Sequence, residues 1–559
     1  MANFTYYLFI YLLLTLLLSL IHGFDINFTK LNSTIIEESQ WIETVEKYIT
    51  DEEHRLSQLK STIDGLKQYN QLAVNDSDAY LSHPINIYLL IKRLATEWPQ
   101  VDKLLDQPTN NKLRLRVNPI ENNELTEAAK GLQNLVNTYQ LDIQALANGS
   151  VQFWSESDGR EIIIPPSDDT HRLTAADCYL IGKQTLIEDY YESAIQWFNE
   201  TIKRSDNSTS DMLFKSELAK HMALAYYRLG DHNQSIHYMN KSENLLLDVD
   251  NLSDTEFMFR QLFVDFMILN KTNNKVVVKT NNNLLNNTSN QLSKTPQQQT
   301  SDNFYKNVTK FYNISQQLCR GVKRLNRSVE SRLKCRYLDT TNRPLLRLTR
   351  VKVEQLLDKP DIVVFHDIIS DREMDVLKQL ASRQMARTMT ESKGGVSRGR
   401  LADGSWLEDM DHEVVERLSR RIGAITGLSM NVTELYNVIK YRVGGYYTNH
   451  YDVTVYRPFS GDQYGRNDPI ATWITYLSDV QSGGATVFPL LDVRVEPRKG
   501  SAVFWFNLKS SGLVDYNMMH FGCPVLAGPP KWIATKWIPF RFQQFNKPCL
   551  LDRHLLNYF

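Results

Sequence analysis

The stretch IATWITYLSDVQSGGATVFP, residues 470–489, decides the fold of the C-terminal part of the chain. It is rich in β-branched and aromatic residues and is divided by a Ser-Gly-Gly break. Short runs of this kind, separated by turn residues, are typical of antiparallel strands. Similar runs follow in VRVEPRKGSAVFWFNL and PKWIATKWI, at 493–508 and 530–538. The spacing predicts a double-sheet jelly roll, or double-stranded β-helix, with flanking helices near 369–385 and 411–425.

A candidate metal site begins just before this stretch, in YRVGGYYTNHYDVTVY at 441–456. His450 and Asp452 are two residues apart, and such residues point to the same face of a strand. With His520 they complete two histidines and one carboxylate, the ligand set of non-haem iron(II) oxygenases, which leaves positions open for a 2-oxo acid and dioxygen. His-x-Asp alone is a weak signal, because such residues are more often surface or capping groups.

A candidate anion-binding lysine follows the second histidine. Lys531 lies on the next predicted strand, where a buried ammonium group would pair with the far carboxylate of 2-oxoglutarate. The alternative is a solvated lysine at a strand end, since Lys536 lies close by in the same run.

The N-terminal part shows a helical repeat over residues 35–70. Apolar residues recur there at intervals of three, four or seven, at Ile42, Val45, Ile49, Leu56, Leu59, Ile63 and Leu66. This heptad pattern predicts an amphipathic helix with coiled-coil character. Its apolar seam needs a partner helix, from the same chain or from a second copy.

Residues 174–245 resemble two helix pairs. YYESAIQWF at 190–198 is similar to DHNQSIHYM at 231–239. The pattern predicts a tetratricopeptide (TPR)-like, all-α domain with a small peptide groove, or alternatively a helical spacer without a ligand. The Asn/Gln-rich residues 269–303 have little to bury and are predicted to be a flexible linker.

Composition and the N-terminus bear on the compartment. A net charge of -1 over 559 residues gives no electrostatic argument for binding nucleic acid. LFIYLLLTLLLSLIHG at 8–23 predicts a signal peptide, with a membrane anchor as the alternative. Repeated Asn-x-Ser/Thr sites, such as Asn27 and Asn148, favour a glycoprotein of the secretory pathway. No second long apolar run follows, so no membrane span is predicted after signal cleavage.

The cysteines are predicted to form two local disulfides in an oxidising compartment. Cys319 is paired with Cys335, and Cys523 with Cys549, because each pair would close a short loop. Cys178 is left over and is interpreted as a small buried hydrophobe.

Several blocks, in order, resemble the α subunit of animal prolyl 4-hydroxylase, the procollagen-proline 4-dioxygenase family. They include LSHPINIYLLIKRLATEW at 81–98, LTAADCYLIGK at 173–183 and HFGCPVLAGPPKWIATKW at 520–537. The resemblance implies Fe(II) and 2-oxoglutarate as cofactor and co-substrate. It implies a role for each of these residues: His450, Asp452 and His520 as iron ligands, Lys531, Tyr441 and Thr486 around 2-oxoglutarate, and Tyr447 and Tyr227 near the peptide substrate.

The resemblance also implies a multidomain α+β architecture. Its parts are a signal peptide at 1–23, a helical dimerisation segment at 24–140, a TPR-like peptide-binding domain at 141–245, a linker at 246–305 and the oxygenase domain at 306–559. It further implies L-ascorbate (vitamin C) as reductant, protein disulfide isomerase as the β subunit of an α2β2 tetramer, a proline-containing peptide substrate and location in the endoplasmic reticulum lumen. The two cysteine pairings agree with the family pattern.

Departures from the family keep other functions open. Pro469 stands where the family has Arg, and His221 and Leu224 stand where it has Tyr in the peptide groove. A groove with fewer aromatic faces is less suited to a polyproline II ligand. The alternatives are the same chemistry on a non-collagen peptide or on another residue, and a non-catalytic peptide-binding or assembly subunit.

Overall fold

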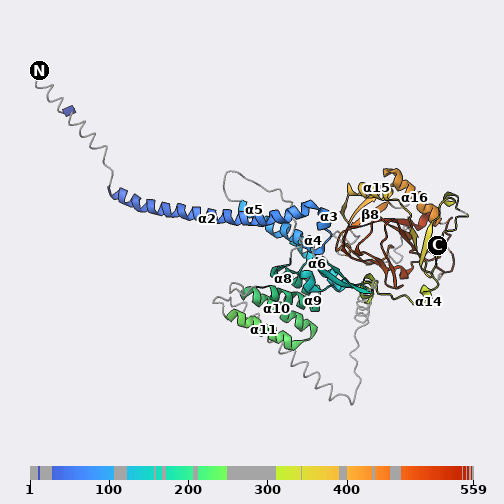
Figure 1. Ribbon diagram of the computed structural model, residues 1–559, viewed down its shortest axis with the longest axis horizontal. Coiled ribbons are helices and arrows are strands. Elements are labelled where there is room, and N and C mark those ends of the chain that lie inside the picture. Colours follow the sequence, from blue (N-terminus) through green and yellow to red (C-terminus); the bar gives the residue numbers. More distant parts are fainter. Residues whose placement is uncertain are drawn as a thin grey trace, which may run out of the picture. The chain divides into compact units, whose positions relative to one another are not determined.

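The computed structural model describes most of the chain (Figure 1). The described residues are 11–12, 28–105, 122–155, 159–165, 172–205, 212–247, 310–341, 343–388, 399–430, 435–453, 468–543, 545–548, 550–552 and 555–556. Most of the predicted signal peptide and nearly all of the predicted linker at 246–305 lie outside them. No helix within the described ranges is long and apolar enough to cross a membrane.

The chain divides into two compact units. The first comprises 1–74 and 97–118, and the second 75–96 and 119–559. The main element of the first unit is the long helix α2 (Phe28–Asn75), accompanied by α5 (Trp98–Leu105). Within this unit the Arg55 guanidinium bonds the Glu52 carboxylate and the Leu104 carbonyl. Much of the predicted heptad seam of α2 is exposed, as are the large apolar side chains of Ile36, Trp41, Ile42, Val45, Tyr48, Ile49 and Leu56.

Helices form the first part of the second unit. In chain order they are α3 Ser77–Tyr80, α4 Pro84–Lys92, the π-helical turn η1 Arg93–Glu97, α6 Asn122–Tyr139, α7 Ile143–Ala147, α8 Ala175–Ile187, α9 Tyr191–Arg204, α10 Met212–Leu229 and α11 His232–Leu247. A hairpin of β1 (Val151–Ser155) and β2 (Arg160–Ile164) separates α7 from α8. Helices α8 and α9 pack closely, because a Cβ at Gly182 would lie 2.7 Å from the Phe198 ring.

The C-terminal part of the second unit, from residue 335 onward, is built on antiparallel sheets. Among the described residues, the larger sheet has nine strands in the order β3-β4-β5-β14-β10-β17-β8-β7-β6. Their bounds are β3 Cys335–Tyr337, β4 Lys352–Leu357, β5 Ile362–His366, β6 Ala386–Arg387, β7 Asp403–Leu407, β8 Tyr436–Tyr441, β10 Pro469–Tyr476, β14 Ala502–Phe506 and β17 Lys531–Pro539.

A smaller sheet of four strands, as far as the chain is described, has the order β13-β12-β15-β9. It consists of β9 Tyr447–His450, β12 Thr486–Phe488, β13 Val493–Val495 and β15 His520–Gly522, and β11 Ser482–Gly483 pairs separately with β16 Val525–Ala527. Short helical turns lie between strands, at α14 Arg327–Glu330, η3 Pro344–Leu346, η4 Asp409–Asp411 and η5 Tyr516–Met518, and a further turn, η6 Phe540–Phe542, follows the last strand.

Two apolar layers cover the faces of the larger sheet. Helices α15 (Asp371–Ser382) and α16 (Glu413–Thr426) pack on its outer face through residues such as Leu377 and Ile422. Its inner face shares a core with the smaller sheet, in which Ile474 and Phe488 both take part. Two antiparallel sheets with helices on one side are consistent with the predicted jelly roll, and both flanking helices lie close to their predicted ranges.

A third core joins the sheets of the C-terminal part to the helical part of the second unit. Ala485, Phe521 and Leu526 from the region of the smaller sheet are buried in it. Helical residues such as Leu132 and Leu146 belong to the same cluster. The smaller sheet is therefore covered on this side by apolar helical side chains.

The disulfide prediction was wrong for Cys319. This residue is bonded to Cys523, with the two Cα atoms 5.6 Å apart, rather than to Cys335. The helical residues 310–319 bring Cys319 into the same core as Cys523. Cys335, in contrast, is exposed on β3, where its register partner on the neighbouring strand β4 is Glu354. The pairing of Cys523 with Cys549 is thereby excluded, and Cys549 itself lies outside the described residues. Cys178 is buried and free, as predicted.

Candidate metal centre

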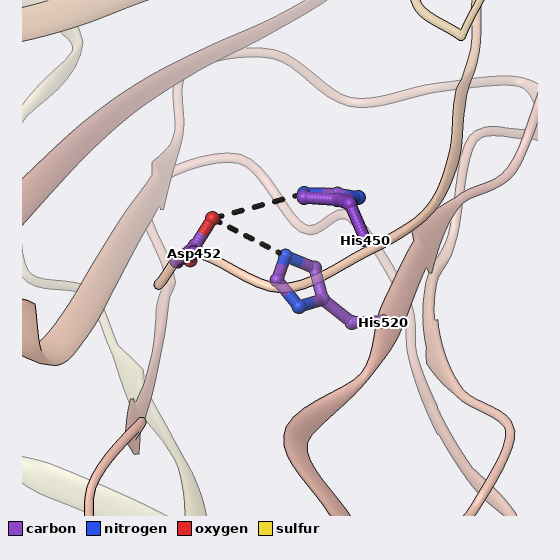
Figure 2. A group of neighbouring side chains, drawn as sticks. All are labelled: His450, Asp452 and His520. Atoms are coloured by element: carbon purple, nitrogen blue, oxygen red, sulfur yellow. Dashed lines mark ion pairs between the residues drawn. The ribbon is translucent and has the colours of Figure 1, made fainter. Parts of the chain in front are cut away.

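Two paired strands place the histidines opposite one another. His450 ends β9 and His520 begins β15, and the two residues are direct partners in the antiparallel register. Asp452 follows β9 by two residues and points toward both rings (Figure 2). The ligand atoms of the three side chains all lie within 4.8 Å of one another. The structure therefore brings the three predicted iron ligands together.

Each imidazole is oriented by a carbonyl two residues before it. Nδ1 of His450 lies 2.7 Å from the Thr448 oxygen, and Nδ1 of His520 lies 3.1 Å from the Met518 oxygen. A carbonyl only accepts, so Nδ1 carries a proton in both rings, and in the neutral ring Nε2 keeps its lone pair. Both Nε2 atoms face Oδ1 of Asp452 at 3.7 Å. This is the tautomer that metal binding requires.

Burial favours the neutral form of the first histidine. Desolvation, and next the neighbouring His520, lower the pKa of His450 well below its ordinary value. A histidine must be neutral to ligate a metal. The site therefore presents two imidazole nitrogens and one carboxylate, a donor set whose chemistry fits a divalent transition metal such as iron(II).

A hydrogen-bonded chain holds the carboxylate of Asp452. The Thr472 hydroxyl donates to Oδ2 at 2.6 Å, and the Asn507 amide donates to that hydroxyl at 2.8 Å. The Trp505 indole N–H donates in turn to the Asn507 carbonyl at 2.8 Å. Oδ1 is left facing the histidines. Sequence reasoning missed Thr472 and Asn507, because a threonine on a strand and an asparagine after one are common.

Aromatic rings line the site. The Trp505 ring lies 4.9 Å from His520, and the Tyr447 ring stacks on His450 at 3.5 Å between centroids. Arg400 lies over the same tyrosine at 4.7 Å and is buried, and its Nε has no hydrogen-bond partner within the described part of the chain. Tyr447 thus lies beside a metal ligand, and Arg400 places a buried cation near the site. Nothing in its local sequence, SRGRLADG, marked it in advance.

The predicted 2-oxoglutarate residues lie around a second buried point, at Lys531. The Lys531 side chain is buried on β17, and its Nζ lies 5.5 Å from the ring centroids of both Tyr441 and Tyr476. Tyr476 donates to the Thr486 hydroxyl at 3.0 Å. Lys531 and Tyr441 are therefore neighbours, and Tyr476, which the sequence did not mark, lies between Thr486 and the lysine.

The lysine is poised to accept an anion. Its Nζ donates to the Gly484 carbonyl at 2.5 Å, and within the described part of the chain this ammonium group forms no ion pair. Burial lowers the pKa of Lys531 to about 7, and the charge of Glu496 opposes this shift only in part. A buried cation without a counter-ion fits a ligand that carries a carboxylate, because pairing offsets the desolvation of the charge.

The predicted peptide contact Tyr227 lies apart from the metal ligands. It is on α10 in the helical part, where its ring is 5.6 Å from that of His232. Near it on the same helix, His221 lies within hydrogen-bond distance of the Tyr179 hydroxyl at 3.2 Å. The structure thus does not bring Tyr227 to the metal site, and aromatic and imidazole groups cluster on α8 and α10.

The fold and this donor set define a class of protein, the 2-oxoglutarate and iron(II) oxygenases. Residues 436–539 match the family described as the 2OG-Fe(II) oxygenase superfamily. They contain the three ligands and Lys531. The solved structure of a viral collagen prolyl hydroxylase from Paramecium Bursaria Chlorella virus-1, in its 2OG complex, is 25% identical and covers 32% of this chain and 95% of its own, with a TM-score of 0.26.

Relatives of known name extend the similarity to nearly the whole chain. Residues 28–153 match the family described as prolyl 4-hydroxylase alpha-subunit, N-terminal region. Prolyl 4-hydroxylase subunit alpha-2 of Gallus gallus is 32% identical, over 93% of this chain and 94% of its own length. Subunit alpha-1 of Homo sapiens is also 32% identical, over 96% and 97%. The chain belongs to the family of prolyl 4-hydroxylase alpha subunits.

Proposed function

We propose that the chain hydroxylates peptidyl proline at C-4, using iron(II), 2-oxoglutarate and dioxygen, with ascorbate as reductant. The observation that carries this proposal is the cluster of His450, Asp452 and His520 on adjoining strands of an oxygenase fold, in a member of this family. When bound, the iron and the 2-oxo acid supply the oxidising chemistry that an unactivated C–H bond requires.

The residues of the chain supply binding and geometry. The two Nε2 atoms and Oδ1 of Asp452 hold the metal, and Thr472 fixes the carboxylate. Lys531 pairs with the far carboxylate of the co-substrate, beside Tyr441 and Thr486. The rings of Trp505 and Phe488, packed against His520, exclude water from this side of the metal.

Removing one ligand tests the metal assignment. His450→Ala is expected to abolish succinate formation and the addition of oxygen to a (Pro-Pro-Gly)-type peptide, measured by mass spectrometry. The matched control is His366→Ala. His366 lies on β5, where its ring contacts the Glu354 carboxylate, and this variant should retain turnover. Normal turnover by His450→Ala would show that this residue is not a metal ligand.

The same assay separates the alternative functions. An iron-dependent reaction with proline-rich peptides supports the proposal, whereas a reaction only with other peptides identifies a different substrate. The absence of succinate with every peptide would favour a non-catalytic binding subunit. A shifted substrate is favoured by one observation: Pro469, where the family has Arg, is paired with Pro539 at the end of β10 and β17. This position therefore offers no cation to a peptide.

We also assign the remaining parts of the chain by proposal. The segment 24–140 dimerises through α2, which the exposed apolar residues of that helix support. The helices of 141–245 form TPR-like pairs that bind the peptide, with Tyr227 in the groove, and 306–559 is the catalytic domain.

The partner is protein disulfide isomerase in an α2β2 tetramer, and the compartment is the endoplasmic reticulum lumen, reached through the signal at 1–23. To test the assembly, the chain is expressed with its signal segment in the secretory pathway and purified, and the presence of the isomerase in the purified protein is measured.

A further inference from the structure

A tyrosine of the helical part reaches into the oxygenase part. Tyr139 is the last residue of α6, is almost fully buried, and donates its hydroxyl to the Pro524 carbonyl at 2.5 Å. The adjoining Thr138 carbonyl accepts from the Arg320 guanidinium at 3.0 Å, which ties the end of α6 down. Burial raises the pKa of Tyr139, so the hydroxyl remains a donor at every physiological pH.

The carbonyl that Tyr139 bonds also anchors a glycine turn. The Gly484 N–H donates to the same Pro524 oxygen at 2.9 Å. Gly483 and Gly484 both have positive φ, 81° and 71°, a conformation that glycine adopts at little cost. A Cβ at Gly483 would lie 2.6 Å from the Tyr139 hydroxyl and 2.5 Å from the Pro524 oxygen. The tyrosine and this turn therefore fit each other closely.

The other side of the turn contacts the lysine of the co-substrate site. The Gly484 carbonyl accepts from Nζ of Lys531 at 2.5 Å, and a Cβ at Gly484 would lie 3.3 Å from Cδ of that lysine. Two hydrogen bonds to Pro524 and one to Gly484 thus connect the Tyr139 hydroxyl to the Lys531 ammonium group. The metal ligands are outside this connection, because β9, β15 and Thr472 orient them.

We propose that Tyr139 is a positioning residue for the co-substrate: it holds the Gly483–Gly484 turn, which in turn places Lys531 for the far carboxylate of 2-oxoglutarate. The inference rests on the proposed function, in which Lys531 binds that carboxylate. It also makes the helical part of the chain a contributor to the co-substrate site. Loss of the hydroxyl affects binding of the second carboxylate and leaves metal binding unchanged.

Direct binding to the full-length protein, loaded with Mn2+ in place of iron, tests this role by calorimetry. Tyr139→Phe is expected to raise the Kd of 2-oxoglutarate and of pyridine-2,4-dicarboxylate about fivefold, the factor that matches one net hydrogen bond of about 1 kcal/mol. Binding of pyridine-2-carboxylate, which chelates the metal but has no second carboxylate, should not change. Gly483→Ala keeps the tyrosine hydroxyl but places a Cβ against it and against the Pro524 oxygen, so the turn must shift and the same two ligands should bind more weakly.

Matched variants separate this inference from its premise. Tyr88→Phe removes another buried hydroxyl of the helical part, which bonds Asp177 at 3.5 Å, and should leave all three affinities unchanged. Equal loss for all three ligands in Tyr139→Phe, or no loss at all, would overturn the inference. Lys531→Met tests the premise: if it binds 2-oxoglutarate normally, the assignment of Lys531 fails, whereas weak binding there with normal binding in Tyr139→Phe defeats the inference alone.

Discussion

At the scale of single residues, the metal site depends on groups that do not touch the metal. The backbone carbonyls of Thr448 and Met518 set the tautomer of each histidine, and Thr472 leaves one oxygen of Asp452 free to ligate. Partners of this kind commonly change metal affinity by a factor of about 10–100 when they are removed. They are therefore as open to test as the ligands.

Thr472→Val is expected to lower metal affinity about tenfold or more, because it removes the donor to Oδ2 of Asp452 and one of the two acceptors of the Asn507 amide. Competition for Mn2+ against a fluorescent chelator measures the change. Thr475→Val, on the same strand but bonded to the Trp473 indole, is the control and should bind the metal normally. Equal affinities of the two variants would show that Thr472 does not support the ligand.

The pKa of Lys531 predicts a pH dependence of co-substrate binding. In the ligand-free protein, burial lowers the pKa of Lys531 from 10.5 to about 7, and a bound carboxylate favours its charged form. Above pH 7 binding must therefore take up a proton, and affinity is expected to fall about tenfold per pH unit. In the absence of ligand, between pH 7 and 10.5, Lys531 is protonated in the unfolded chain and largely neutral in the folded one. The free energy of unfolding is therefore expected to rise with pH through that window.

Calorimetry of 2-oxoglutarate binding in buffers with different ionisation heats measures the proton uptake. In Lys531→Met the uptake should disappear. An affinity that stays constant from pH 7 to 9 in the unaltered protein would contradict the prediction.

The site was only partly predictable from residue patterns. His450 and Asp452 follow from strand geometry, because side chains two residues apart share a face. His520 and Lys531 could be named as candidates, but the resemblance was needed to single them out, since nothing local states which distant histidine meets the pair. Arg400 could not be found at all, because its position over Tyr447 arises from a bridge between two segments far apart in the sequence.

At the scale of elements, the strands were easier to predict than their order. Short aromatic and β-branched runs predicted β10, β14 and β17 near their observed bounds. Their neighbours in the sheet were not predictable, because β14 lies between β5 and β10, and pairing across long loops leaves no local trace in the sequence. The register of β9 and β15 is the decisive case, since it alone sets the two histidines opposite each other.

Helix α2 gives a prediction at this scale. Val45 and Ile49 are exposed on it, in the heptad seam proposed to dimerise. The double change Val45→Asp, Ile49→Asp should weaken association about 100-fold or more, because burying one large apolar side chain contributes about 1.5–3 kcal/mol. Sedimentation velocity would then show the species without a second α subunit. Ser57→Asp, outside the seam, is the control, and an unchanged sedimentation coefficient of the double variant would refute the dimer seam.

At the scale of the whole molecule, one disulfide closes a long segment. Cys319 and Cys523 are 204 residues apart, whereas the local pairings favoured by sequence spacing would each close a short loop. Spacing alone was misleading, because the core that holds both residues brings together segments from each end of that interval.

Cys319→Ser and Cys523→Ser should each lower the free energy of unfolding by about 2–5 kcal/mol, and the double variant by no more than either single one. Denaturant unfolding measures the loss, and non-reducing peptide mapping identifies the bond. Cys335→Ser should have no effect, because that thiol is exposed and free. A loss in Cys335→Ser equal to that in Cys319→Ser would favour the local pairing.

The core shared by the smaller sheet and the helices limits how the chain can be divided for expression. A recombinant fragment that starts at residue 306 would keep every metal ligand but would expose Ala485, Phe521 and Leu526 to water. Contiguous apolar surface of this kind promotes aggregation. Soluble yield should therefore recover once the fragment begins before residue 75, where the second compact unit starts, and a truncated catalytic piece is a poor starting point for crystallisation or inhibitor screening.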